Sequence, residues 1–170
     1  MFLRVWKTTT LVVTALAVGS SFVHVLEYPQ KLYYDDYFYS AVNSTLYGAF
    51  GVVGGVLFCG SILMSAVLIW LMRRSRRGMW TAVAGTVFLI AGLVSWTLIV
   101  APVNAQAVAA WKQSHPEDLE RLTPEAYRVS PSEVIEVWHR QRARWEYGHR
   151  VTFLLMLAGF TALAWSQAEP

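Results

Sequence analysis

Two pairs of ionisable residues stand at the ends of apolar stretches in this chain of 170 residues. His24 precedes Glu27 by three positions, and Glu146 precedes His149 by three positions. Residues with this spacing lie on the same face of a helix. Ionisable side chains at membrane depth are costly to keep, so they are candidates for function by default. Imidazole and carboxylate groups together suit Fe, Cu, Mn or Zn, and all four residues are predicted metal ligands.

The two pairs occur in opposite order along the chain. In an outward first helix and an inward fourth helix, the two glutamates share one level and the two histidines lie about 4.5 Å deeper. The four groups then converge at one depth and favour a single metal ion. A glutamate that does not bind the metal, Glu27 or Glu146, is predicted to act as a catalytic base.

Two polar residues are expected to support this site. Asn104 follows Pro102, where the third helix is expected to break, and can add an oxygen ligand or a hydrogen bond to a ligand. Arg144 lies two residues before Glu146 and can bind the carboxylates. Two other interpretations stay open. The Glu and His side chains can form a purely structural cluster with Arg144 or Arg150, or the two histidines alone can be the axial ligands of a haem b.

Composition indicates the elements that position these residues. The chain is 55% hydrophobic and 15% charged, whereas an average soluble domain is about 25% charged. A soluble fold of this size cannot hide so much apolar surface, and disordered chains are charge-rich and poor in aromatics. We predict an all-α, polytopic membrane protein, a four-transmembrane-helix bundle with an extracytoplasmic helical excursion before the fourth helix.

The uncharged stretches place the transmembrane spans within a single domain of residues 1–170. A span needs about 20 apolar residues, and the predicted spans are approximately 8–27, 46–71, 79–101 and 148–167. The polar outer excursion covers 111–147. Within it, Ser130 to Glu133 forms a capping box with Pro131 at the first helical position, so the fourth helix is expected to start near Pro131. Thr123, Pro124 and Glu125 look like a second, shorter helix start.

The basic residues predict the orientation. Arg73, Arg74, Arg76 and Arg77 form a dense run between two apolar stretches, and short loops of this kind remain in the cytoplasm. The protein is therefore expected in the inner cell membrane, in contact with lipid and with both termini cytoplasmic. The same location explains the net charge of +3 without a nucleic-acid partner.

Several other patterns limit the function. Gly51 and Gly55 form a small-xxx-small motif for close helix packing, which we interpret as a contact within the bundle. Cys59 is the only cysteine, so an internal disulfide and a thiolate metal cluster are excluded. The sequence contains no Gly-rich phosphate loop, no Ser-His-Asp set and no CxxC motif, which argues against an ATPase, a serine hydrolase or a thiol–disulfide enzyme.

Three segments together resemble a known family. They are His24-x-x-Glu27-x-Pro29-x-Lys31, then Pro102-Val103-Asn104 followed by Trp111, and finally Arg144-Trp145-Glu146-x-x-His149. In this order they are similar to the bacterial branch of the anthrone-oxygenase-like integral membrane proteins, long described as a domain of unknown function. The resemblance implies a four-span fold and site residues at His24, Glu27, Asn104, Glu146 and His149. It also implies oxidation by O₂ without an organic cofactor, but no particular substrate.

The expected function is that of a membrane oxidoreductase or oxygenase. It would act on a hydrophobic aromatic or quinol-like small molecule through a transition metal held by the His and Glu residues. Two alternatives belong to other classes. The chain can be a non-catalytic subunit of a membrane complex or a homo-oligomer, or it can be a small haem b protein.

Overall fold

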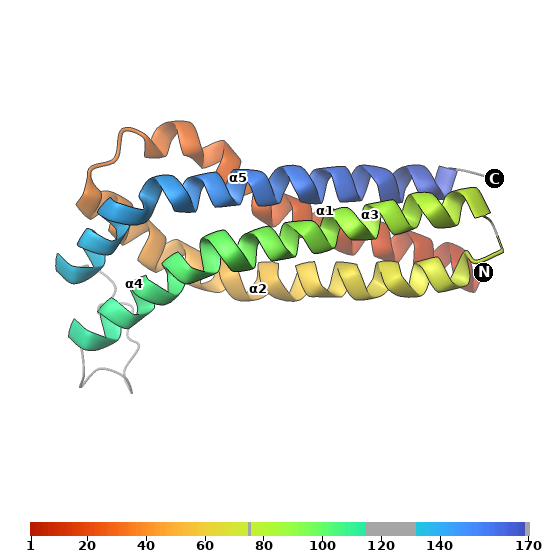
Figure 1. The fold of residues 1–170 in the computed structure, drawn as a ribbon, viewed down its shortest axis with the longest axis horizontal. Helices are drawn as coiled ribbons and strands as arrows, with labels where there is room; N and C mark the ends of the chain where they lie inside the picture. The colour runs from red at the N-terminus through yellow and green to blue at the C-terminus, as the bar shows by residue number, and fades with distance from the viewer. Residues whose placement is uncertain (75, 115–131, 169–170) are drawn as a thin grey trace.

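The computed structural model describes residues 1–74, 76–114 and 132–168, without the side chains of 44–49, 77 and 114. The described part is helical and contains no strand. Its elements are α1 (Phe2–Lys31), α2 (Asp36–Leu71), α3 (Arg76–Ser95), the π-helical turn η1 (Trp96–Val100), α4 (Ala101–Ser114) and α5 (Ser132–Ala168). Figure 1 shows them side by side as an elongated bundle.

Four helical segments are long and apolar enough to cross a membrane. They are Phe2–Lys31, Phe50–Leu71, Gly78–Gln113 and Ser132–Ala168. Their outer surface carries many large apolar side chains, among them Leu16, Val56 and Leu154, which suits contact with lipid tails. The prediction of an all-helical, four-helix, multi-pass membrane bundle is confirmed.

Both chain termini lie at one end of the bundle, together with the turn between α2 and α3 (Figure 1). We call this end proximal and the opposite end distal. At the distal end, α1 turns back into α2 through residues 32–35. The carboxylate of Asp35 caps α2 by accepting a hydrogen bond of 2.7 Å from the backbone N–H of Phe38, which satisfies one of the free donors of the first turn.

The third membrane segment does not break at Pro102, as the sequence had led us to expect. Pro102 is the second residue of α4, and helical structure continues from Arg76 to Ser114 through η1. A proline inside a helix removes one backbone donor and crowds the preceding turn. The π-helical turn directly before Pro102 absorbs this disturbance, and such turns occur often near functional sites.

The fourth segment is one helix of 37 residues, α5. It starts at Ser132 and includes the polar residues 132–147 that we had assigned to the outer excursion, as well as the predicted span 148–167. The predicted helix start at Thr123 and the first two residues of the capping box, Ser130 and Pro131, lie outside the described residues. The position of the ionisable residues of α5 is therefore fixed by a continuous helix that also packs in the membrane core.

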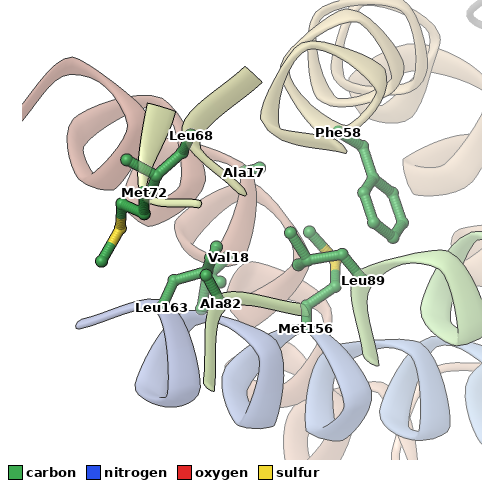
Figure 2. Close-up of a cluster of buried hydrophobic side chains, with 9 residues drawn as sticks. All are labelled: Ala17, Val18, Phe58, Leu68, Met72, Ala82, Leu89, Met156 and Leu163. Atoms are coloured by element: carbon green, nitrogen blue, oxygen red, sulfur yellow. The ribbon is translucent and has the colours of Figure 1, made fainter. Parts of the chain in front are cut away.

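The apolar core of the bundle lies toward the proximal end and joins all four membrane segments (Figure 2). Its buried residues are Ala17, Val18, Phe58, Leu68, Met72, Ala82, Leu89, Met156 and Leu163. Several buried hydroxyls in the helices bond to carbonyls of their own helix, as Thr14 Oγ1 does to Thr10 O at 2.7 Å. Such groups allow close packing without an unsatisfied donor.

We interpreted Gly51 and Gly55 as a contact within the bundle, and this prediction is wrong for both residues. Gly51 and Gly55 are exposed, and a Cβ built at either position meets nothing within 4 Å. The neighbouring Gly54 makes the contact with α1 instead, where its Cβ would lie 3.3 Å from Ser20 Oγ. The spacing correctly predicted a face of small residues on α2, but it could not predict whether that face points into the bundle or outward.

Candidate functional site

The distal end contains a second core cluster, which includes Tyr39, Val103, Trp138 and Trp145. Four ionisable residues lie against it, and we call them the ionic cluster: Glu27, Lys31, Tyr39 and Glu146. They come from the last turns of α1, the first turn of α2 and the middle of α5. The ionic cluster is therefore assembled from three helices.

Lys31 is the centre of the ionic cluster. Its ammonium Nζ lies 3.4 Å from Glu27 Oε2 and 3.5 Å from Glu146 Oε1. The Lys31 side chain is 2% exposed and that of Glu146 is 3% exposed, whereas Glu27 is 36% exposed. A buried charge needs a partner in order to persist, and here one cation connects a fully buried carboxylate with one that reaches the surface.

Tyr39 completes the coordination of Glu146. Its hydroxyl donates a hydrogen bond of 2.9 Å to Glu146 Oε1. Burial, together with the negative charge of Glu146, raises the pKa of the Tyr39 phenol above its ordinary value. The phenol therefore stays protonated and acts as a donor to the carboxylate. Among the described residues, the second oxygen of Glu146, Oε2, is buried without a hydrogen-bond partner.

Arg142 connects α5 to the turn between α1 and α2. Its guanidinium donates to the carbonyl of Tyr34 at 3.0 Å and to that of Lys31. It also lies over the Tyr39 ring, 4.3 Å from the ring centroid. Arg142 thus binds one carbonyl at the end of α1 and one in the turn that follows, and it holds Lys31 and Tyr39 in position from one side.

The two other arginines near the site have different positions. Arg144, predicted to support the carboxylates, is exposed and donates to Leu98 O at 3.1 Å. It lies two residues from Glu146, about 200° around the helix, so it faces away from the ionic cluster. Arg150 lies over the Tyr28 ring, 4.1 Å from its centroid, and its Nε donates to the backbone carbonyl of Glu146 at 3.3 Å.

The two predicted histidines lie together, one helix turn deeper than the glutamates. The rings of His24 and His149 are stacked, with centroids 3.8 Å apart and an interplanar angle of 29°. The Trp145 ring packs edge-on against both, at 5.1 Å from His24 and 4.2 Å from His149. Within the described part of the chain, His149 Nε2 is buried and has no hydrogen-bond partner.

Asn104, also predicted to support the site, acts through this tryptophan. Trp145 Nε1 donates to Asn104 Oδ1 at 2.8 Å. Asn104 comes from α4, which reaches this position because the helix continues past Pro102. The hydrogen bond fixes the rotation of the Trp145 ring, and that ring in turn borders both imidazoles.

We expect Asn104→Leu to loosen this arrangement, because it leaves a buried indole N–H without an acceptor. Such a loss costs about 1–3 kcal/mol of unfolding free energy. In a protein that already carries Trp145→Phe, Asn104→Leu should cost much less unfolding free energy, since the indole donor is then absent. Unfolding in mixed detergent micelles measures both variants. If Asn104→Leu cost the same in the wild-type protein and in the Trp145→Phe variant, the coupling between Asn104 and Trp145 would be contradicted.

The arrangement of donors does not suit a metal ion. An imidazole binds a metal through a lone pair in its ring plane, and two rings in face-to-face contact do not direct their lone pairs to one point. The ammonium of Lys31 already lies between Glu27 and Glu146. Among the described residues, no group of three or more His, Cys, Asp or Glu side chains is placed to hold a metal.

The geometry also does not suit the haem alternative. The axial histidines of a haem bind the iron from opposite faces of the macrocycle. With His24 and His149 in ring contact at 3.8 Å, no macrocycle fits between them. Neither a metal nor a haem carries any step of the chemistry considered below.

Comparison with family models, curated proteins and solved structures finds no match to this chain. The resemblance to anthrone-oxygenase-like proteins therefore stays a prediction based on the three segments quoted above.

Sequence analysis did not select Lys31, Tyr39 or Arg142 as site residues. One signal was available for Arg142, which precedes Glu146 by four residues and so shares its helix face. Lys31 likewise follows Glu27 by four residues. No comparable pattern existed for Tyr39, which belongs to a different helix from either glutamate.

Proposed function

We propose that this chain is a membrane oxidoreductase that uses dioxygen as its oxidant and acts on a hydrophobic aromatic or quinol-like molecule at the distal end. The ionic cluster carries the proposal. Buried ionisable residues in membrane proteins line proton relays and substrate sites more often than they serve packing alone. Here they extend without interruption from the buried Tyr39 and Glu146 through Lys31 to the partly exposed Glu27.

Oxidation of a quinol releases two protons and two electrons. With dioxygen as the acceptor, a quinol and O₂ give a quinone and hydrogen peroxide. The protein has to accept a proton at membrane depth, where water is scarce. Among the described residues, Glu146 Oε2 and His149 Nε2 are two buried atoms without a hydrogen-bond partner that can take part in this step. The positive charge of Lys31 stabilises the phenolate that remains when the proton leaves. Glu27 exchanges protons with water, so that the reduced dioxygen receives two protons and leaves as hydrogen peroxide.

The surroundings of the ionic cluster favour a flat apolar substrate. Tyr39, Trp138 and Trp145 pack edge-to-face around it, with Trp138 and Trp145 5.6 Å apart. Aromatic side chains with a few polar groups are typical of sites for small apolar molecules. Aromatic rings of this kind bind other rings by stacking or edge contacts.

We further propose that the protein lies in the inner membrane with both termini in the cytoplasm. The positive residues between α2 and α3 and those near the N-terminus support this orientation. The ionic cluster then lies at the outer rim of the membrane, and a quinol-like molecule reaches it from the lipid.

Purified protein in detergent, supplied with dioxygen and a set of hydroquinones and anthrones, tests this function. We expect oxygen consumption that depends on Glu146, with Glu146→Gln lowering kcat about 100-fold or more, the range of a general base. Glu136→Gln is the matched control, because Glu136 pairs with Arg140 in the exposed part of the same helix. Absence of oxygen consumption with every compound, or an active Glu146→Gln protein, would contradict the proposal.

Elemental analysis of the same protein separates this mechanism from the metal-dependent one expected from the sequence. The stacked histidines lead us to expect no stoichiometric transition metal. One Fe, Cu, Mn or Zn per chain, lost in both His24→Ala and His149→Ala, would instead support metal chemistry. It would require the two imidazoles to separate when the metal binds.

One observation favours a second candidate, a subunit role in a complex or a homo-oligomer. The exposed face of α2 combines Gly51 and Gly55 with the exposed Val52 and Val56, a surface that another helix can approach closely. Native mass spectrometry after gentle extraction distinguishes the cases. A monomer of 19.2 kDa argues against a subunit role.

A further inference from the structure

A shallow apolar groove lies between α3 and α5 near the proximal end, far from the ionic cluster. Its volume is about 500 Å³, and its lining includes Thr81, Leu157, Ala158, Ala162 and Trp165. Small residues at 158 and 162 create the hollow, while Trp165 forms one wall. A groove of this shape on a surface that faces lipid accommodates an extended hydrocarbon chain.

The charge at this end of the molecule is positive. Arg73, Arg74 and Arg76 are exposed beside the start of α3, and Arg4 is exposed near the start of α1. Every Asp and Glu that the structure describes belongs to the distal end, in the last turns of α1, the first turn of α2 or the first half of α5. Within the described residues, no carboxylate neutralises the proximal arginines, so they attract anions.

Aromatic side chains mark the same level as a membrane–water boundary. Trp70, Trp80 and Trp165 are all exposed, and the guanidinium of Arg73 lies over the Trp70 ring at 4.5 Å. Tryptophan is enriched where headgroups meet the hydrocarbon region. The arginines therefore lie at headgroup level, and the groove begins just below it.

From this combination we propose that the groove binds an anionic phospholipid, with one acyl chain in the groove and the phosphate at the arginines. Arg76 precedes Thr81 by five residues, about 7.5 Å along the helix axis and about 140° around it, so its charge lies at headgroup level above the groove and not on the helix face that lines it. The positive charge selects an anionic headgroup over a zwitterionic one. The apolar lining selects a lipid over a free phosphate.

Native mass spectrometry of delipidated full-length protein tests the site, with phosphatidylglycerol and phosphatidylcholine of identical acyl chains as probes. We expect tighter binding of phosphatidylglycerol by about tenfold or more. Each basic residue near an anionic lipid contributes about fivefold to binding. Arg74→Gln with Arg76→Gln should therefore remove most of the preference, while Arg4, Lys7 and Arg77 remain to keep the orientation. Ala162→Phe, which fills the groove, should weaken the binding of both lipids about tenfold.

Two control variants leave the groove intact. Lys112→Gln with Arg140→Gln removes two exposed charges at the distal end, and Val67→Phe adds a ring to an exposed position of α2. Neither should change the binding of either lipid. Equal affinity of wild-type protein for the two lipids would show acyl-chain binding without headgroup selection and would overturn the proposal. An unchanged affinity in Ala162→Phe would show charge attraction without the groove and would overturn it as well.

Discussion

Replacing Lys31 with methionine is expected to destabilise the protein by about 3–5 kcal/mol, the usual cost of removing one partner from a buried ion pair. The loss does not come from the ion pair alone. Glu146 stays 3% exposed, and without Lys31 its negative charge keeps, among the described residues, the hydrogen bond of the Tyr39 hydroxyl and the charge of Arg142. Removing the ammonium also leaves Glu27 without its contact at 3.4 Å.

The double variant Lys31→Met with Glu146→Gln should recover most of this loss, because the uncompensated charge is then gone while Tyr39 can still donate to the amide oxygen. Buried ion pairs replaced as a pair are often close to neutral in stability. Arg140→Met is the matched control, since its pair with Glu136 at 3.1 Å is exposed and worth less than about 1 kcal/mol. Unfolding in mixed micelles gives the free energies of Lys31→Met, Glu146→Gln, the double variant and Arg140→Met. If the costs of Lys31→Met and Glu146→Gln added up in the double variant, the coupling would be disproved.

The scarcity of charge and the helical spacing were enough to predict the fold and the common depth of the two histidines, although these were expected as metal ligands and not as stacked rings. Uncharged stretches gave four membrane segments, and the mirrored order of the pairs implied that His24 and His149 meet at one depth. The structure stacks their rings at 3.8 Å. This inference worked because the direction of each helix and the rise per residue are fixed by general helix geometry.

The sequence could not reveal which cation lies between the two glutamates. Lys31 is at the end of α1, and its position beside Glu146 depends on the packing of α5 against α1. Tyr39 reaches the ionic cluster only because the turn at residues 32–35 is short and Asp35 starts α2 at once. Both positions depend on tertiary packing and not on local sequence. The neighbouring Tyr33 and Tyr37, with the same residue type and a similar position, are exposed.

Pro102 and the glycines show a second limit. A proline usually marks the end of a helix, but a π-helical turn of five residues lets this helix continue to α4 and bring Asn104 to Trp145. Gly51 and Gly55 carried the motif for close packing, whereas a close helix crossing with backbone contact uses Gly85 and Gly159, which belong to different helices. Spacing along one helix cannot identify a pair formed between two helices.

That crossing gives the second large expected effect. A Cβ at Gly159 would lie 2.9 Å from the backbone oxygen of Gly85 and 2.9 Å from Leu89 Cδ2. A backbone oxygen cannot move away without moving α3, so we expect Gly159→Val to separate α3 from α5 and to cost about 2–3 kcal/mol, as overpacked cores do. The thermal midpoint and the micelle unfolding curve should both fall.

Gly55→Ala is the control for this substitution, because a Cβ there meets nothing within 4 Å. Alanine favours a helix over glycine by about 1 kcal/mol, so this variant should be neutral or slightly more stable. The two glycines therefore separate helix propensity from interhelical contact. If Gly159→Val were tolerated as well as Gly55→Ala, α3 and α5 would not be in backbone contact. The positions of the α5 residues in the site would then also be wrong, because they depend on how α5 packs.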